Sequence, residues 1–598
     1  MASEKTSLAD KASATVEMRE DTSSTPPNTI RPVNSQTLPV TTANPSSTPS
    51  TDPNTVRAAV LREEECYNSL AYAYPTRKKW IILTVMGLVQ ISMNYNAAVF
   101  SNAVQPIAKD FNVSEDYVRK GQMIFLLSYA FGCELWAPWS EELGRKNVLQ
   151  ASLGLVNIWQ ILCATSRGVP QILAGRFLGG LSSAGGSVTL GIVADMFEPD
   201  RQQYAVAFVV LTSCGGSVVG PVVGGFIQQH LHWRWNFWIQ LIIGAAVQLI
   251  HLFCVPETRS SVLLDREAKK LRKRGIKEVY GPNEGRSWRQ RFTVREVCKI
   301  WARPFVMFCR EPIVLCLSLL SGFSDALIFT FLESYGYTFE QWHFSPIQLG
   351  LAFIPLLVGY VIAYFMFFPF FKKQQALMIR SGTDALVPEQ RLKLLLFLAP
   401  LLFIGMFGFA WSATGPPIPW AVPLAISILI GMANLAIYMA TIDYMVAAYG
   451  PYASSATGGN GFARDLLAGL SALYAKPLYH NIGPKGLRLQ AASTLLAGVA
   501  IAVVIPIYIF YWYGPWIRSK SHFAKKVEAD RRARMGESGS LPIALFHYHH
   551  CPLLPRSTER AFNLTTTLDR QQNQASKYMN SHYRPGDDAP LSRERGAC

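Results

Sequence analysis

The chain has 598 residues, of which 50% are apolar and only 16% are charged, and its formal net charge is +16. Soluble domains carry roughly a quarter charged residues, so this composition argues against a large soluble enzyme and favours a membrane protein. Because Lys and Arg lie mainly outside the apolar runs, we attribute the positive charge to membrane topology and an anionic leaflet rather than to a nucleic-acid site.

Residues 1–79 differ in composition from the rest of the chain. Ser, Thr and Pro make up 22 of the 36 residues between Asp21 and Val56. Such a segment cannot bury enough apolar surface to offset the entropy lost on ordering. We therefore predict a disordered cytoplasmic tail over 1–79.

Apolar runs begin at Trp80 and recur along the chain. A membrane-spanning helix needs about 20 mostly apolar residues. We predict an all-α membrane protein with 12 transmembrane helices arranged as two six-helix halves. The halves cover 80–256 and 312–515, and the loop 257–311 joins them. The predicted spans are 80–103, 121–140, 147–166, 169–194, 204–228, 234–255, 312–334, 347–371, 393–413, 418–441, 453–475 and 490–514.

The positions of Lys and Arg predict the orientation. The loop 257–311 holds 15 Lys or Arg against seven Asp or Glu. Because Lys and Arg concentrate on the cytoplasmic side, we expect this loop, both termini and the tail 516–598 to be cytoplasmic. Asn112 begins the sequon Asn112-Val113-Ser114 in the first outside loop and is a candidate glycosylation site. We expect no metal site in the tail, at His547, His549, His550 and Cys551.

Four local patterns carry more information than hydropathy. Residues 137–146 (APWSEELGRK) form a charged turn between two spans, in which carboxylates face cations. Residues 176–186 place Arg176 inside a span beside small residues, and such an Arg usually faces a cavity or an acidic partner. Residues 215–225 (GGSVVGPVVGG) put a helix-kinking Pro among glycines that allow tight packing. The aromatic stretch 233–238 suits the membrane interface.

These patterns resemble motifs of fungal major facilitator superfamily transporters of the twelve-spanner drug:proton antiporter group. The turn 137–146 resembles motif A, residues 176–186 resemble motif B, and residues 215–225 resemble motif C, the antiporter motif. The stretches 256–259, 388–392, 449–456 and 513–518 extend the likeness. The chain departs from motif A at Ala137, at Glu141, where the family has aspartate, and at Glu142, where it has arginine. A second-half copy of motif A is not recognisable around residues 371–373.

The resemblance implies roles for the matched residues and an alternating-access mechanism, in which two halves rock around a central cavity. It implies a monomer in the lipid bilayer that is driven by the proton gradient and needs no other cofactor. The implied inner gate comprises Glu141, Gly144, Arg145, Lys146, Asp195 and Arg201. The implied antiporter motif comprises Gly216, Gly220, Pro221, Gly224 and Gly225.

Ionisable residues inside the predicted spans are few. A carboxylate in such a place is by default a candidate for proton relay. Glu134 and Asp325 are therefore the carboxylates that we expect to couple protons, together with Arg176. Glu333 lies near an outer span end, and we expect it to contact water. The candidates for the substrate cavity are Asn94, Tyr95, Asn434, Tyr438, Asn460 and Arg464.

The predicted function is proton-coupled export of small amphipathic organic molecules, such as xenobiotics, antifungals or a fungal secondary metabolite. One alternative is an importer or exchanger of a small nutrient or polyamine, and another is a non-transporting membrane sensor. We expect no enzyme, because zinc-site, serine-hydrolase and phosphate-loop motifs are absent from the sequence. The plasma membrane is the expected location, with the vacuolar membrane as the alternative.

Overall fold

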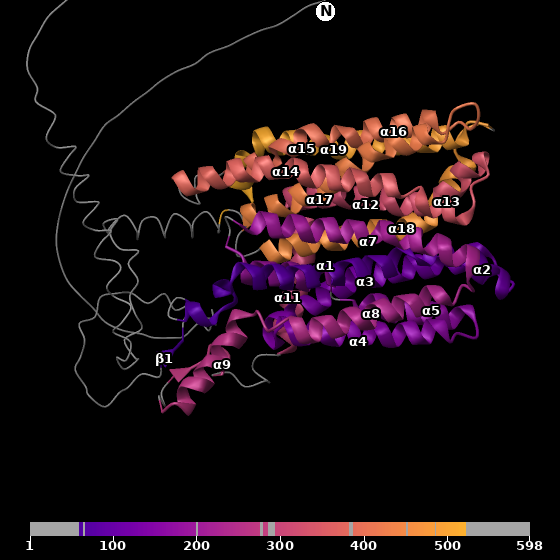
Figure 1. Cartoon of the computed structure of the whole chain (residues 1–598). Coiled ribbons are helices and arrows are strands. Elements are labelled where there is room, and N and C mark those ends of the chain that lie inside the picture. Colours follow the sequence, from indigo (N-terminus) through magenta and orange to yellow (C-terminus); the bar gives the residue numbers. More distant parts are fainter. Residues whose placement is uncertain are drawn as a thin grey trace, which may run out of the picture. The chain divides into compact units, whose positions relative to one another are not determined.

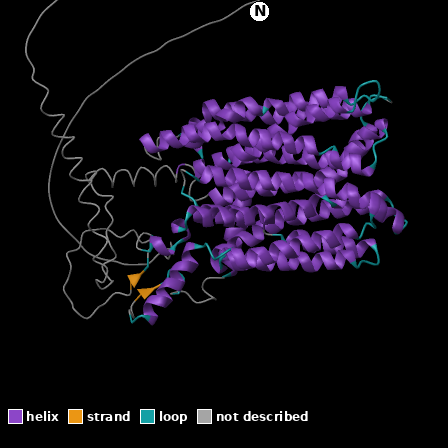
Figure 2. Ribbon diagram, viewed as in Figure 1, coloured by secondary structure: helices purple, strands orange, loops and turns teal. Residues whose placement is uncertain are grey.

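A computed structural model describes most of the chain between residues 59 and 525. The described ranges are 59–61, 63, 66–183, 185–198, 201–275, 279–284, 293–381, 387–449, 453–484, 486–521 and 525. Helices dominate these ranges, and the short strands β1 (Ala59–Val60) and β2 (Val279–Tyr280) pair in parallel (Figure 2). The predictions for residues 1–58 and for the tail beyond 525, including its His and Cys cluster, lie outside the described residues.

The first six predicted spans all fall in helices. The span 80–103 is extended into two helices, and the span 169–194 is divided within its Gly-rich stretch, where helix propensity is low. The helices are α1 (Thr76–Ala98), α2 (Phe100–Asp110), α3 (Glu115–Leu143), α4 (Arg145–Ala164), α5 (Val169–Ser182), α6 (Gly185–Met196), α7 (Gln202–His230) and α8 (Trp235–Cys254).

The last six predicted spans also fall in helices. Several helices are longer than the apolar runs that predicted them, because polar residues continue the backbone hydrogen bonding. The last helix, for example, extends beyond the predicted boundary at 515. The helices are α12 (Pro312–Phe339), η3 (Glu340–Trp342), α13 (Pro346–Leu351), α14 (Ile354–Ser381), η5 (Pro388–Leu392), α15 (Lys393–Leu398), α16 (Pro400–Ser412), α17 (Ala421–Tyr449), α18 (Ala453–Asn481) and α19 (Arg488–Lys520).

Within the described residues, nine candidate spans are long and apolar enough to cross a membrane. The other three predicted spans lie in α3, in α5 with α6, and in α18. The helices α5 and α6 are each short, while α3 and α18 carry the buried charges described below. Hydropathy therefore understates the spans that hold charged residues.

The two halves meet along paired helices. The helix α3 packs against α18, and α7 packs against α13 and α14. In Figure 1, α4 and α8 lie at one edge of the helical bundle, and α15, α16 and α19 lie at the opposite edge. The seam between α3 and α18 is consequently interior, where charged side chains are shielded from lipid.

Two predicted segments are more ordered than expected. The loop 257–311 contains α9 (Ser260–Lys273) and α11 (Val294–Arg310) in addition to β2. The predicted disorder over 1–79 is wrong for residues 66–79, which include the short helices η1 (Tyr67–Ser69) and η2 (Ala71–Ala73) and the start of α1. The tyrosines of these helices hydrogen-bond to residues far away in sequence, Tyr67 to Glu198 Oε1 at 3.0 Å and Tyr72 to the carbonyl of Ala194 at 2.9 Å, which composition alone does not reveal.

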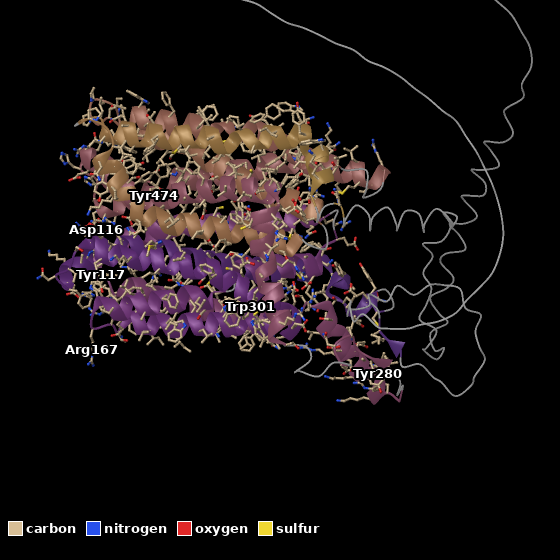
Figure 3. The ribbon with its side chains drawn as sticks, turned by 180° about the vertical axis from the view of Figure 1, so that it is seen from behind. Asp116, Tyr117, Arg167, Tyr280, Trp301 and Tyr474 are labelled. Carbon is tan, nitrogen blue, oxygen red and sulfur yellow. The ribbon has the colours of Figure 1, made fainter. Side chains whose placement is uncertain are left out.

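The bundle has two ends, which we name by their turns. The α3–α4 turn at Gly144 marks the Gly144 end, and the α2–α3 turn at Asn112 marks the Asn112 end. Figure 3 labels Asp116 and Tyr117 at the Asn112 end and Tyr280 beyond the other end. In the predicted topology the Gly144 end is cytoplasmic.

Candidate functional site

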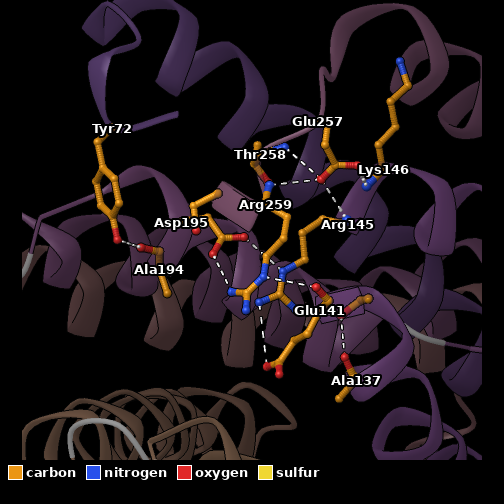
Figure 4. Close-up of polar contacts among 12 residues, drawn as sticks. Tyr72, Ala137, Glu141, Arg145, Lys146, Ala194, Asp195, Glu257, Thr258 and Arg259 are labelled. Carbon is orange, nitrogen blue, oxygen red and sulfur yellow. Dashed lines mark hydrogen bonds and ion pairs between the residues drawn. The ribbon is translucent and has the colours of Figure 1, made fainter. Parts of the chain in front are cut away.

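The predicted gate residues Glu141, Arg145 and Asp195 meet at the Gly144 end (Figure 4). Arg145 Nε donates to Asp195 Oδ2 at 3.0 Å, and Arg145 Nη1 donates to Ser140 Oγ at 2.6 Å. Glu141 Oε1 lies 4.0 Å from Arg145 Nη2. These contacts tie the α3–α4 turn to the end of α6 within the N-terminal half.

Glu257, from the stretch after α8, organises this turn. Its Oε1 accepts the backbone N–H of Arg145 at 2.9 Å and that of Arg259 at 3.0 Å, while its Oε2 accepts that of Lys146 at 3.3 Å. A carboxylate at this place is stabilised by the free N–H groups and the dipole at the start of α4. Glu257 is thus part of this cluster, although the sequence analysis did not include it among the predicted gate residues.

Gly144 permits this close approach. Its φ is +96°, and a Cβ on it would lie 2.3 Å from Glu257 Oε2. Arg259 adds a second cation, with Nη1 3.5 Å from Asp195 Oδ1. Arg201, the remaining predicted gate residue, is the exposed N-cap residue of α7. The cluster therefore contains a buried carboxylate held by two arginines, which is a stable arrangement for a partly dry site.

Two tyrosines of the N-terminal segment form hydrogen bonds with backbone carbonyls beside this cluster. The Tyr72 hydroxyl donates to the carbonyl of Ala194 at 2.9 Å (Figure 4), and the Tyr74 hydroxyl donates to that of Glu257 at 3.3 Å. Burial raises the pKa of Tyr72, and the negative charge of Asp195 raises it further. Both phenols thus remain donors at neutral pH.

The C-terminal half has a counterpart of this cluster. Arg391 in η5 donates to Asp443 near the end of α17, as Arg145 donates to Asp195 near the end of α6. Arg518 Nε and Nη2 donate to the Glu389 carboxylate at 2.8 and 3.0 Å. The sequence around residues 371–373 does not reveal this counterpart because its members lie far apart in the chain.

A polar bridge joins the halves at the Gly144 end. Gln203 Nε2, at the start of α7, donates at 2.8 Å both to Gln374 Oε1 and to Asp443 Oδ2. The next residue, Tyr204, packs edge-on against Phe371, with the ring centroids 5.4 Å apart. One link between the halves at this end is therefore a hydrogen bond from an amide to the carboxylate of the C-terminal charge pair.

Ion pairs join the halves at the Asn112 end. Arg119 Nε of α3 lies 2.6 Å from Glu333 Oε2 of α12, and Lys476 Nζ of α18 lies 2.9 Å from Asp116 Oδ1. The Glu333 side chain is only 7% exposed. The expectation that Glu333 contacts water is wrong, because Arg119 compensates its burial. The described halves are thus linked at both ends.

A buried charge cluster lies between these links. Arg464 of α18 has Nε 3.7 Å from Asp325 Oδ2 of α12 and Nη2 4.0 Å from Asp465 Oδ1. Its guanidinium carbon lies 4.0 Å from the centroid of the Tyr438 ring of α17. These four residues bring together the central faces of α12, α17 and α18.

Glu134 reaches this cluster from the N-terminal half. Its side chain faces Gly458 of α18, where a Cβ would lie 2.6 Å from the Glu134 Oε2. It is close enough to Asp465 for the two carboxylates to repel each other. Within the described residues, no Lys or Arg lies within ion-pair distance of Glu134. Glu134 and Asp325 thus share one region across the α3–α18 seam.

Several atoms in this region lack hydrogen-bond partners among the described residues. They include Nε and Nη1 of Arg464 and both side-chain polar atoms of Asn460, one turn earlier on α18. Buried polar atoms are nearly always paired, so such unmet atoms indicate a place for water or a ligand. The cluster can therefore bind protons on its carboxylates and polar groups on Arg464 and Asn460.

Arg176 lies outside the charge cluster around Arg464. Its Nη1 donates to the carbonyl oxygen of Asn96 at 2.9 Å and to Asn96 Oδ1 at 3.0 Å, and its guanidinium stacks on Phe125 at 3.9 Å. No described carboxylate pairs with it, so an acidic partner is not found among the described residues, and its Nη2 has no hydrogen-bond partner there. Carbonyl oxygens and the aromatic faces of Phe125 and Phe100 compensate this cation instead.

The glycines of the antiporter motif allow two close contacts. A Cβ on Gly216 or Gly220 would lie 2.8 or 2.7 Å from α1 atoms, and one on Gly224 would lie 2.5 Å from Asn102 Oδ1 of α2. A Cβ on Gly225 would lie 2.5 Å from the carbonyl oxygen of Pro346 in α13. The helix α7 continues through Pro221. It therefore packs tightly on its own half and, by its other face, on the opposite half.

The predicted cavity residues divide into two groups. Asn434, whose Nδ2 donates to Ser324 Oγ at 2.9 Å, joins Tyr438, Asn460 and Arg464 on the C-terminal side. Asn94 instead donates to Ser213 Oγ at 3.1 Å between α1 and α7, and Tyr95 is buried with no partner for its hydroxyl among the described residues. The Asn94 contact is the interhelix hydrogen bond that is common between membrane helices.

The comparisons with known proteins agree with this fold. Residues 86–472 match the Major Facilitator Superfamily. The chain belongs to this superfamily. It is a multi-pass membrane protein of the transporter class, similar to fungal drug-type transporters. The proton:xylose symporter XylE shares the fold, with a TM-score of 0.52 and 18% identity over 73% of this chain and 96% of that one.

Three curated relatives are transporters from fungi. The MFS-type transporter acdC of Aspergillus candidus is 30% identical over 75% of this chain and 87% of that protein. The ascochitine biosynthesis cluster MFS transporter of Didymella fabae is 29% identical, with coverage of 76% and 87%. The multidrug transporter FLU1 of Candida albicans is 29% identical, with coverage of 76% and 74%.

Proposed function

We propose that this major facilitator chain is a proton-coupled exporter of small amphipathic organic molecules. The carrying observation is the buried cluster of Glu134, Asp325, Arg464 and Asp465, which spans the seam between halves that are linked at both ends. Intramembrane carboxylates of this kind mark proton or ion pathways. The relatives, one from a biosynthesis cluster and one a multidrug transporter, support export as the direction.

The proposed cycle uses the two links in turn. Separation at the Gly144 end breaks the Gln203 contacts and moves α3 away from α18, which exposes Glu134 to water at that end. Separation at the Asn112 end breaks the Arg119–Glu333 pair and exposes the cluster to the other side. A proton and a substrate that favour opposite states then exchange across the membrane.

The proposed substrate is polar at one end and apolar elsewhere. The unmet nitrogens of Arg464 and the amide of Asn460 offer polar contacts, and the Tyr438 ring offers an apolar face. Small-molecule sites typically combine mostly apolar walls with a few such groups. A fungal secondary metabolite, an antifungal or another xenobiotic fits this chemistry. Arg176 would act at a distance, through α5, because it does not touch the cluster.

The proposal extends to location and assembly. The chain acts as a monomer in the plasma membrane, with the vacuolar membrane as the alternative, and both termini are cytoplasmic. The Gly144 end, where Arg145, Lys146 and Arg259 gather, then faces the anionic leaflet, as the positive-inside rule favours. The proton gradient supplies the energy, and no other cofactor is required.

The test is accumulation of dyes, azoles and fungal metabolites in yeast cells that express the chain, with and without a protonophore. We expect lower accumulation of at least one compound, and we expect the protonophore to abolish the difference. Higher uptake of a compound would indicate an importer. No change for any compound, with surface expression confirmed, would contradict export of this class and favour a sensor.

A further inference from the structure

The helix α11 occupies a special place in the connection between the halves. Only Glu311 separates it from the membrane helix α12. Since Glu333 near the other end of α12 pairs with Arg119 at the Asn112 end, α12 begins at the Gly144 end. Connectivity thus holds α11 beside the membrane surface at that end.

One face of α11 packs across the seam between α3 and α18, and we call this helix the strap. Trp301 Nε1 donates to the carbonyl of Leu135 in α3 at 3.2 Å. The Phe305 ring lies edge-on to Phe462 of α18, with centroids 4.9 Å apart, and stacks on Phe131 of α3 at 6.1 Å. Trp301 contacts Leu135, the residue that follows Glu134. The helix α11 therefore lies beside the part of α3 that carries Glu134.

The side of α11 that adjoins this contact face carries an exposed apolar stripe. Its residues follow one another at intervals of four, four, four and three positions, which places them along one side of a helix. Val294 is 77% exposed and Val306 is 37% exposed. The stripe consists of Val294, Cys298, Ala302, Val306 and Cys309.

Exposed cations lie beside this stripe. Arg303 and Arg310 lie on the side of the helix next to Val306, while Arg295 lies between Ala302 and Val306 at the first turn. A helix with an exposed apolar side and a basic polar side lies in the plane of a membrane interface, and its cations are attracted to anionic lipid. Continuity with α12 brings the C-terminal end of α11 to the Gly144 end, while Phe305 contacts Phe131 within the predicted span 121–140.

We propose that the stripe docks α11 into the anionic leaflet at the Gly144 end, so that lipid holds the strap against the seam. The apolar side chains enter the headgroup and acyl boundary, and the arginines contact lipid phosphates. Because α11 contacts both α3 and α18, lipid that holds this helix opposes separation of the seam. This inference concerns lipid binding and does not depend on the proposed direction of transport.

The test is a depth measurement on the full chain in lipid vesicles. Cys298 is kept as the single cysteine and spin-labelled, and a matched variant carries the label through Arg303→Cys on the polar side. In vesicles of phosphatidylcholine and phosphatidylserine, we expect the label at 298 to collide with oxygen and to be protected from a water-soluble nickel chelate. The label at 303 should collide more with the chelate.

Two other results would overturn the proposal. A label at 298 that collides freely with the chelate would place the stripe in water, and one that collides with neither reagent would place it under protein. A triple variant, Arg295→Gln with Arg303→Gln and Arg310→Gln, tests the charge. We expect phosphatidylserine to deepen the label at 298 in the chain with intact arginines and not in this variant. Equal depth with and without phosphatidylserine in both would contradict the role of anionic lipid.

Discussion

Gln203 and Asp443 come from opposite halves of the chain, and the Gln203 amide donates to the Asp443 carboxylate at 2.8 Å. Asp443 is also paired with Arg391, so one carboxylate serves both the C-terminal charge pair and the link between the halves. The equivalent carboxylate in the other half, Asp195, is paired with Arg145 of its own half and with Arg259 of the segment that follows it. The closure at the Gly144 end is therefore asymmetric.

Removal of the Gln203 amide should favour opening at the Gly144 end. Gln203→Ala deletes two buried hydrogen bonds, which costs about 1–3 kcal/mol and corresponds to roughly a 5- to 150-fold shift toward the open state. Cys214 lies near the charge cluster and is buried. Its labelling by a maleimide should accelerate in a chain with no other cysteine. The neighbouring, half-buried Gln202→Ala is the control, and equal rates in both variants would refute the link.

Loss of the ion pair at the other end should have the opposite effect. Glu333→Ala leaves Arg119 with its neighbour Asp116, so we expect a cost of about 1–3 kcal/mol and easier opening at the Asn112 end. Faster labelling of Cys214 by an impermeant maleimide added outside would report it. The swap Arg119→Glu with Glu333→Arg should restore part of the protection. If the swap labels as fast as Glu333→Ala, the pair does not hold this end closed.

A side chain at Gly144 should destabilise the gate cluster. Gly144→Ala forces a φ of +96° on alanine and drives its Cβ into Glu257, so we expect a loss of about 1–3 kcal/mol in unfolding free energy. The midpoint of thermal unfolding in detergent measures it. Gly498→Ala is the matched control, since a Cβ there meets nothing within 4 Å. A Gly144→Ala chain as stable as this control would argue against the Glu257 contact.

The topology predicts a glycan on Asn112. This residue is exposed in the turn between α2 and α3, with φ +53°, and Ser114 of its sequon accepts the Tyr117 N–H at the start of α3. An endoglycosidase should increase the electrophoretic mobility of the expressed chain, and Asn112→Gln should remove this shift. The second sequon, at Asn563, should remain bare. A glycan on Asn563 instead would invert the predicted orientation.

Hydropathy predicts the helices because each span must satisfy its backbone hydrogen bonds internally and present apolar side chains to lipid. All twelve predicted runs lie in helices. The ends of the helices were predicted less well. Helix α17 continues past the predicted end at residue 441 to Tyr449, because the charged Asp443 ends the apolar run without ending the helix. The docking of Tyr72 and Tyr74 was missed because it depends on carbonyls far away in sequence.

The candidate site was predicted where local pattern and burial coincide. Glu134, Asp325 and Arg464 stand out as charges in apolar runs, and the structure brings them together. Arg119 and Gln203 did not stand out, because they lie at span ends where polar residues are ordinary. The sequence does contain a signal for the pairing of Arg119 with Glu333. These two residues are opposite charges at the ends of two predicted spans. Arg176 was predicted to couple protons together with Glu134 and Asp325, and its described partners are carbonyls and rings, which leave no charge pattern in sequence.

The most direct test of the account is substrate flux in proteoliposomes under an imposed pH gradient, once a substrate is in hand. We expect the gradient to drive substrate accumulation by the unsubstituted chain. We expect Glu134→Gln to abolish this dependence while exchange of substrate across the membrane persists. Glu340→Gln, at an exposed carboxylate outside the cluster, should behave like the unsubstituted chain. Gradient-driven accumulation that survives both Glu134→Gln and Asp325→Asn would contradict proton coupling at the buried cluster.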